Sequence, residues 1–140
     1  MSHLPINVLC LDDTDVVCES LERWFNMHCD FRWVGECKST ARLDEVVRRS
    51  GPDVVLLDLD LPETPANDMI AHLVEMTPRP RVLVLTSRPD ARNVSDAMEA
   101  GADGYIVKEL GMADIAAAVT RAVAHDAATP PRHRISRIGA

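Results

Sequence analysis

Residues 53–62 read DVVLLDLDLP, and this stretch decides the fold. Its four apolar residues, 54–57, are followed at once by Asp58, and Pro62 comes four residues later. An unbroken run of Val and Leu is typical of a strand that is covered on both faces, as in a parallel sheet. The stretch therefore predicts a buried strand that ends on a carboxylate.

Other apolar runs alternate with helical patterns along the rest of the chain. The runs cover residues 6–11, 31–35, 82–85 and 105–107. Between them apolar residues recur at helical spacing, in stripes that begin at Val17, Leu43, Met69, Val94 and Met112. Five strand–helix units predict an α/β domain with helices on both faces of the sheet. In such a sheet, ligands bind beyond the carboxyl ends of the strands.

The composition sets limits on the class of protein. A length of 140 residues favours one domain, and the net charge of −7 argues against nonspecific binding of nucleic acid. The chain has no apolar run long enough to span a bilayer and no charged-then-apolar leader, so we expect a cytoplasmic protein. Its four cysteines lack C-x-x-C spacing, which favours reduced thiols.

The alternating pattern stops after about Ala124. The remaining residues, 125–140, include two adjacent prolines and three arginines and few apolar residues. We therefore expect a domain over residues 1–124, followed by a flexible tail or the start of a linker.

Polar residues gather where the predicted strands end. These residues are Asp12, Asp13, Asp58, Thr86, Ser87 and Lys108. The fold brings such positions to one edge of the sheet, where neighbouring carboxylates repel and a hard cation such as Mg²⁺ relieves the repulsion. A carboxylate beside a cation, a lysine and a hydroxyl suits phosphoryl transfer, in which the carboxylate oxygen attacks in line.

This constellation resembles the receiver domain of two-component response regulators over residues 6–124. The resemblance rests on five elements in order: Asp12-Asp13, Asp58 with Pro62, Thr86-Ser87, Ala100-Gly101-Ala102, and Tyr105-x-x-Lys108. It implies a doubly wound, flavodoxin-like parallel sheet of five strands in the order 2-1-3-4-5, within three α/β/α layers.

The resemblance also implies a role for each site residue. Asp58 would be the phosphoacceptor. Mg²⁺, or Mn²⁺ in its place, would be held by Asp12, Asp13, Asp58 and the backbone carbonyl of Asp60. Lys108 would pair first with Asp58 and then with the phosphoryl group.

Further residues would read out the modification or tune its lifetime. Thr86 and Ser87 would contact the phosphoryl group, and Tyr105 would turn inward as Thr86 moves. The face made by the fourth helix, fifth strand and fifth helix would change as a result. Asp60 and Arg88 flank the expected phosphoryl position, and we expect them to influence the lifetime of the phosphate.

The implied partner is a sensor histidine kinase or phosphotransfer protein, whose phosphohistidine supplies the phosphoryl group. The domain would be a switch that catalyses only its own modification, not an enzyme in the usual sense. The Lys108-Glu109 pair resembles members with a helix-turn-helix output, so a C-terminal DNA-binding domain can lie outside this sequence. A homodimer through the fourth helix to fifth helix face, and no contact with a membrane, are also expected.

Some features leave other functions open. Ala66 stands where the family usually has glycine, which hints at a phosphorylation-independent protein-binding module. The D-x-D sequence of Asp58 and Asp60 also looks like the nucleophile motif of haloacid-dehalogenase-type phosphatases. Taken alone, Asp12 and Asp13 could cap a helix, and so could Thr86 and Ser87. Tyr105 could be a static core residue.

Overall fold

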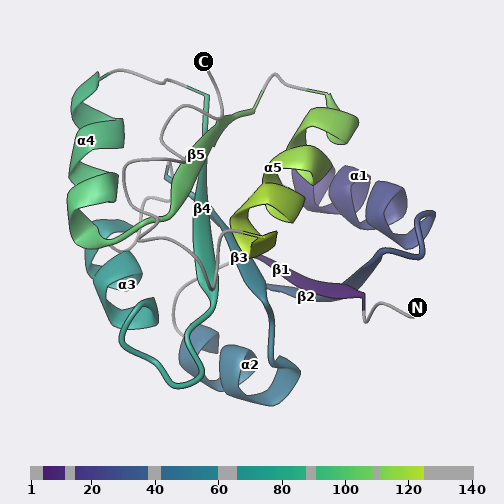
Figure 1. Cartoon of the computed structure of the whole chain (residues 1–140), viewed down its shortest axis with the longest axis horizontal. Coiled ribbons are helices and arrows are strands. Elements are labelled where there is room, and N and C mark those ends of the chain that lie inside the picture. Colours follow the sequence, from purple (N-terminus) through teal and green to yellow (C-terminus); the bar gives the residue numbers. More distant parts are fainter. Residues whose placement is uncertain are drawn as a thin grey trace.

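The computed structural model describes residues 5–11, 15–37, 42–59, 66–87, 91–108 and 111–124. Five strands alternate with five helices along these residues (Figure 1). In chain order they are β1 (Ile6–Leu11), α1 (Asp15–Asn26), β2 (Phe31–Cys37), α2 (Leu43–Ser50), β3 (Val54–Asp58), α3 (Ala66–Leu73), β4 (Arg81–Thr86), α4 (Ala91–Ala100), β5 (Gly104–Val107) and α5 (Met112–Ala124).

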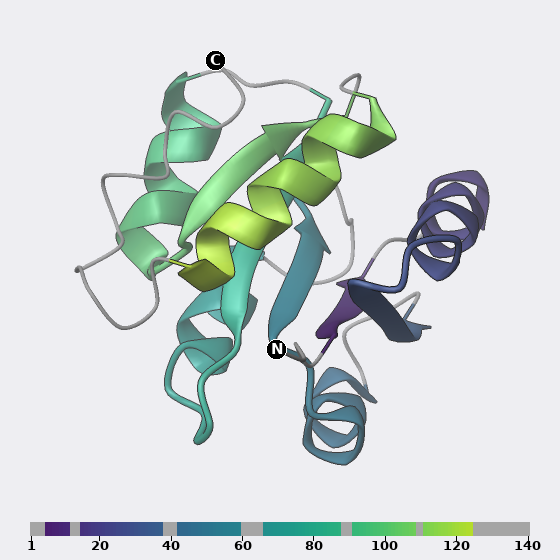
Figure 2. The ribbon, with the colours of Figure 1, turned by 45° about the vertical axis from the view of Figure 1, so that its right-hand side comes forward.

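The strands form a single parallel sheet in the order β2-β1-β3-β4-β5, as the resemblance implied. Helices cover both of its faces, with α1 and α5 on one side and α2, α3 and α4 on the other (Figures 1 and 2). The predicted three-layer α/β fold is therefore confirmed.

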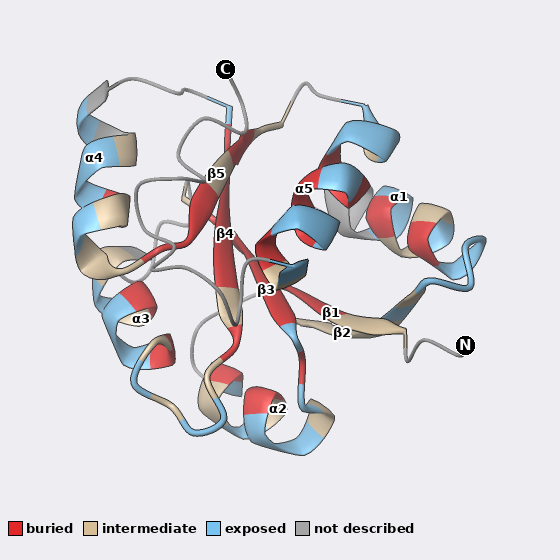
Figure 3. Cartoon of the chain, viewed as in Figure 1, coloured by how far each residue is buried: buried red, intermediate tan, exposed pale blue. Residues whose placement is uncertain are grey.

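Two apolar clusters form the core, one on each face of the sheet, because successive side chains of a strand point to opposite faces. In β3, Leu56 belongs to the cluster under α1 and α5, whereas Leu57 belongs to the cluster under α2, α3 and α4. Every residue of β3 is buried, which makes it the innermost part of the fold (Figure 3). This explains why its sequence is an unbroken apolar run.

The register of the sheet aligns the carboxyl ends of the central strands. Leu11, the last residue of β1, is paired with Leu57 of β3. Asp58 is paired with Leu85, and the next residue of β4, Thr86, is paired with Val107 of β5. Residues at the ends of four strands are thus brought to one edge.

The strands extend further than the apolar runs predicted. The strand β2 continues to Cys37, and β4 begins at Arg81. A strand ends where its backbone pairing with a neighbouring strand ends. Polar residues such as Glu36 and Arg81 take part in this pairing, so the strands include them. Among the helices that the structure describes, none has the length and apolar content needed to cross a bilayer.

Candidate functional site

An ion pair between Asp58 and Lys108 lies at the carboxyl edge of the sheet. Asp58 ends β3 with its side chain 1% exposed, and Lys108 follows β5 with its side chain 18% exposed. The Lys108 Nζ atom lies 3.0 Å from the Asp58 Oδ1 atom. Because β4 lies between β3 and β5, the lysine must reach past the end of β4 to make this contact.

The backbone fixes both partners of the pair. The Leu59 N–H donates to the Leu85 carbonyl at 2.9 Å, so pairing of β3 with β4 continues past Asp58. The Lys108 N–H donates to the Thr86 carbonyl at 2.8 Å, which continues the pairing of β5 with β4. A buried carboxylate is costly unless it is paired, and the folded strands supply its cation.

Thr86 ends β4, the strand that lies between those of Asp58 and Lys108. It is fully buried at the end of β4, and alternation along β4 places it on the same face as Val84 and Val82. Tyr105 is paired with Val84 and packs, half-buried, against the same apolar cluster. The structure therefore places Thr86 and Tyr105 on the face that carries α4, while the exposed Ser87 follows Thr86.

Several predicted site residues lie outside the described residues, namely Asp12, Asp13, Asp60 and Arg88. The strand β1 ends at Leu11, directly before the acidic pair in sequence, and Leu11 is paired with Leu57, which directly precedes Asp58. Within the described ranges, no group of three or more His, Cys, Asp or Glu side chains could hold a metal ion. The carboxylate of Asp58 is a donor of the type that Mg²⁺ prefers.

Ala66, which replaces the family's usual glycine, is the first residue of α3. None of the described residues other than glycine has a positive φ, so alanine meets no strain of that kind here. The preceding prolines, Pro62 and Pro65, lie outside the described residues.

Asp103 is a buried acidic residue that the sequence analysis did not single out. Among the residues that the structure describes, the buried polar side chains are Asp58, Thr86 and Asp103. Asp103 precedes β5, at the opposite edge of the sheet from Asp58. A surface cavity of 470 Å³ lies at that edge too, lined in part by Arg79 and Arg81 and by none of the predicted site residues.

The fold and the buried acid–lysine pair define a class of protein, the parallel α/β domains with a reactive edge beyond the carboxyl ends of their strands. Residues 8–120 match the response regulator receiver domain family, and the chain belongs to it. The match covers most of β1, all of the other four strands and most of α5.

Individual relatives agree with this assignment. The chain is 33% identical over 114 residues to the DNA-binding transcriptional activator DevR/DosR of Mycobacterium tuberculosis, which covers 81% of this chain and 52% of the relative. It is 30% identical over 118 residues to the response regulator protein VraR of Staphylococcus saprophyticus, covering 84% of this chain and 56% of the relative.

Solved structures show the same architecture. The signal receiver domain of the response regulator NarL from Mycobacterium tuberculosis superimposes with a TM-score of 0.79 at 26% identity, covering 87% of this chain and 98% of that one. A LuxR-family two-component response regulator from Aurantimonas sp. gives 0.78 at 25% identity, covering 86% of each chain. The chain spans about half the length of the curated relatives it matches, between 44% and 56% for three of them.

Proposed function

We propose that this chain is a phosphorylation-activated receiver that accepts a phosphoryl group on Asp58 from the phosphohistidine of a sensor histidine kinase or phosphotransfer protein. One observation carries the proposal, the 3.0 Å pair between the buried Asp58 carboxylate and the Lys108 amine at the carboxyl edge of the sheet. Membership of the receiver family supports it.

The chemistry needs little more than a positioned nucleophile. An oxygen of Asp58 attacks the phosphorus atom, the bond from phosphorus to the donor histidine breaks, and the electron pair of that bond leaves with the imidazole. The lysine amine, already held beside the carboxylate, is placed to bind an oxygen of the transferred group.

A bound Mg²⁺ ion would supply further positive charge to offset the charge of the phosphoryl group. We propose that Asp12, Asp13, Asp58 and the Asp60 carbonyl hold this ion. The oxygen donors of these residues suit Mg²⁺, and the sequence places Asp12 directly after Leu11, the partner of Leu57 in the sheet.

The response to phosphorylation would pass through Thr86 to the face that carries α4. A phosphoryl group adds between one and two negative charges and three acceptor oxygens. The hydroxyls of Thr86 and Ser87 would bind these oxygens, and Tyr105 would repack as Thr86 moves. Thr86 and Tyr105 lie on one face of the sheet, which supports this route.

Asp60 and Arg88 are proposed to set the lifetime of the phosphate. A carboxylate and a guanidinium that flank the phosphoryl group could pair and restrict the approach of water. The phosphate half-life of Arg88→Ala, compared with that of the wild type, tests this idea, and equal half-lives would refute it.

The output is proposed to lie in a further domain or partner. DevR/DosR, a DNA-binding transcriptional activator, is about twice as long as the part that this chain matches, so residues 1–124 would act as the regulatory domain, with residues 125–140 as a tail or linker to a DNA-binding domain. A homodimer through α4, β5 and α5 would form on phosphorylation.

Intact mass spectrometry tests the proposed function. The wild type is incubated with acetyl phosphate and Mg²⁺, beside Asp58→Asn and an EDTA control. We expect the mass of one phosphoryl group to be gained only by the wild type with Mg²⁺. An equal gain by Asp58→Asn would refute the assigned acceptor, and no gain from either acetyl phosphate or a phosphohistidine donor would favour a phosphorylation-independent binding module.

A further inference from the structure

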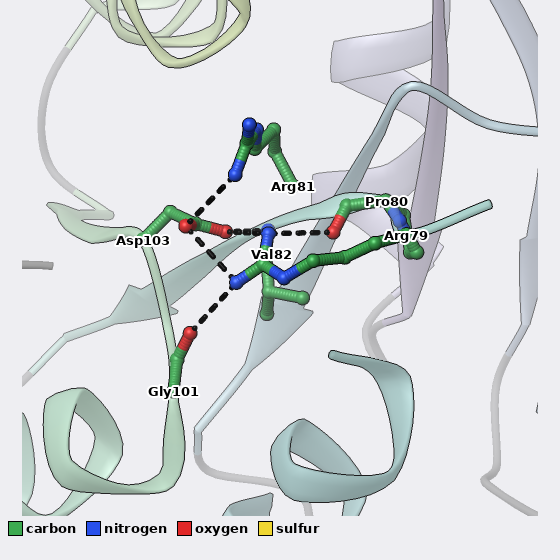
Figure 4. A network of polar contacts seen from close by, with 6 residues as sticks. All are labelled: Arg79, Pro80, Arg81, Val82, Gly101 and Asp103. Carbon is green, nitrogen blue, oxygen red and sulfur yellow. Dashed lines mark hydrogen bonds and ion pairs between the residues drawn. The ribbon is translucent and has the colours of Figure 1, made fainter. Parts of the chain in front are cut away.

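A buried ion-pair network surrounds Asp103, at the edge of the sheet opposite the acceptor (Figure 4). The Arg79 guanidinium binds both carboxylate oxygens of Asp103, each at 3.1 Å. The Val82 N–H donates to the Oδ2 atom at 2.8 Å, and the Arg81 Nη1 atom lies 3.6 Å from the Oδ1 atom. The Asp103 side chain is only 1% exposed, whereas that of Arg79 is 30% exposed, so the carboxylate end of these contacts is protected from solvent.

The same network holds the C-terminal end of α4. The Arg79 Nη2 atom donates to the Gly101 carbonyl at 3.2 Å, directly after the helix (Figure 4). The Gly101 N–H donates to the Met98 carbonyl and the Ala102 N–H to the Ala97 carbonyl, each at 3.1 Å. These two bonds form the Schellman motif that closes a helix. One arginine thus ties the end of α4 to the start of β5.

Packing is unequal along α4. Near its C-terminal end, Ala97 is fully buried, and Ala102 just beyond the helix is fully buried as well. Nearer the N-terminal end, Val94 is only half-buried, and Arg92 and Ser95 are exposed. Among the α4 side chains that the structure describes, the one fully buried side chain, Ala97, therefore lies in the C-terminal half, and fewer buried contacts make the rest of an element easier to displace.

The N-terminal end of α4 is also the end nearest to Thr86 in the chain. The strand β4 ends at Thr86, and α4 begins at Ala91. A displacement of Thr86 would therefore reach this end of α4 first along the backbone, whereas the other end is held through Arg79 to Asp103, which also accepts from the Val82 N–H.

We infer that the Arg79–Asp103 network is the pivot about which α4 turns when Asp58 is phosphorylated, an inference that rests on the proposed function. The network acts as a positioning device, because it touches neither the acceptor nor the phosphoryl group. The movement of α4 is largest at Ala91 and smallest at Gly101. Without the network the C-terminal end moves as well. Phosphorylation then displaces the whole of α4 and not mainly its N-terminal end.

Hydrogen–deuterium exchange on the full chain tests the pivot, with and without acetyl phosphate and Mg²⁺ and with phosphorylation verified by intact mass. In the wild type, phosphorylation should change exchange by about threefold or more in residues 87–95 and leave residues 97–104 nearly constant. In Arg79→Ala, phosphorylation should also raise exchange in residues 97–104, by about fivefold.

Two further variants test whether Arg79 acts as a pivot for α4 or only stabilises the fold. Arg48→Ala removes an arginine that lines the same cavity but pairs with Asp44 at 3.4 Å, so it should behave as the wild type. Arg79→Lys keeps the charge but not the two-pronged guanidinium, and it should give an intermediate response. If Arg79→Ala does not fold, the same comparison is made with Arg79→Lys: exchange of residues 97–104 that rises on phosphorylation supports the pivot, and unchanged exchange refutes it.

The outcomes distinguish the pivot from the proposed function. A wild type that gains a phosphoryl group and changes its exchange equally along the whole of α4 would refute the pivot alone. In Arg79→Ala, an increase in the exchange of residues 97–104 that is the same with and without phosphorylation would also refute the pivot. A merely structural contact would matter equally in both states. A wild type that gains no phosphoryl mass would refute the proposed function, and the switching role of the pivot with it.

Discussion

At the scale of single residues, the position of Asp58 and Lys108 at the ends of neighbouring parts of the sheet determines how strongly they interact. Asp58 is a carboxylate held with 1% of its side chain exposed, and the Lys108 amine lies 3.0 Å away. A similar pair on the surface, Arg42 with Glu45, is separated by 3.2 Å, but the two side chains are 70% and 51% exposed. The two pairs have similar distances but should differ in energy, because water screens the exposed pair much more than the buried one.

Replacing Lys108 with alanine should destabilise the chain. We expect the free energy of unfolding to fall by about 2 kcal/mol, since Asp58 loses its lysine partner while remaining buried. Urea unfolding followed by tryptophan fluorescence measures the change. Arg42→Ala is the matched control and should cost less than about 0.5 kcal/mol, because its pair is exposed. Equal costs for the two variants would contradict the stabilising role of the buried pair.

The sequence predicted some of the polar residues at the two edges of the sheet and not others. Asp58, Thr86 and Lys108 could be identified because each directly follows an apolar run, and parallel strands bring their carboxyl ends together. Asp103 precedes its strand, and its partner Arg79 comes from the connection between α3 and β4. No local pattern links these two positions, so only the folded backbone reveals their contact.

At the scale of elements, the helix α4 ends at a glycine whose backbone conformation and surroundings disfavour a side chain. Gly101 has a φ of 119°, and a Cβ atom built on it would lie 3.1 Å from the Val74 Cγ2 atom. The positive φ favours glycine, and a side chain here would also press against Val74, which directly follows α3. The ends of the strands are decided differently, by pairing with a neighbour, and this is why β2 and β4 extend past their apolar runs.

Gly101→Ala should therefore cost more than the same change at another helix end. Gly51, which follows α2, has a φ of 59° and nothing within 4 Å of a built Cβ atom. We expect Gly51→Ala to cost about 1 kcal/mol from backbone strain alone, and Gly101→Ala about 3 kcal/mol from strain and overpacking together. Thermal or urea unfolding of both variants gives the comparison. A smaller loss for Gly101→Ala than for Gly51→Ala would show that Val74 yields without cost.

The whole molecule is stabilised by one sheet with an apolar cluster on each face. The residues of both clusters lie between Ile6 and Val123. The family match, over residues 8–120, covers nearly the same part of the chain. The core of the described residues and the matched family domain therefore occupy nearly the same part of the chain.

Ending the chain after Ala124 should leave its stability unchanged to within about 0.5 kcal/mol. Ending it after Arg121 is the sharper comparison, since this also removes Ala122, which is 1% exposed, and the half-buried Val123. That shorter chain should lose at least about 1 kcal/mol in the free energy of unfolding. A large loss from the first truncation would mean that residues 125–140 contribute to the fold.

The two-sided core has an evolutionary consequence. Because alternate residues of each strand supply separate clusters, the sheet isolates the packing of α1 and α5 from that of α2, α3 and α4. Substitutions that adapt one side to a new partner need no compensating substitutions on the other. Recognition surfaces on opposite faces can thus diverge independently, while the polar edge between them retains its chemistry.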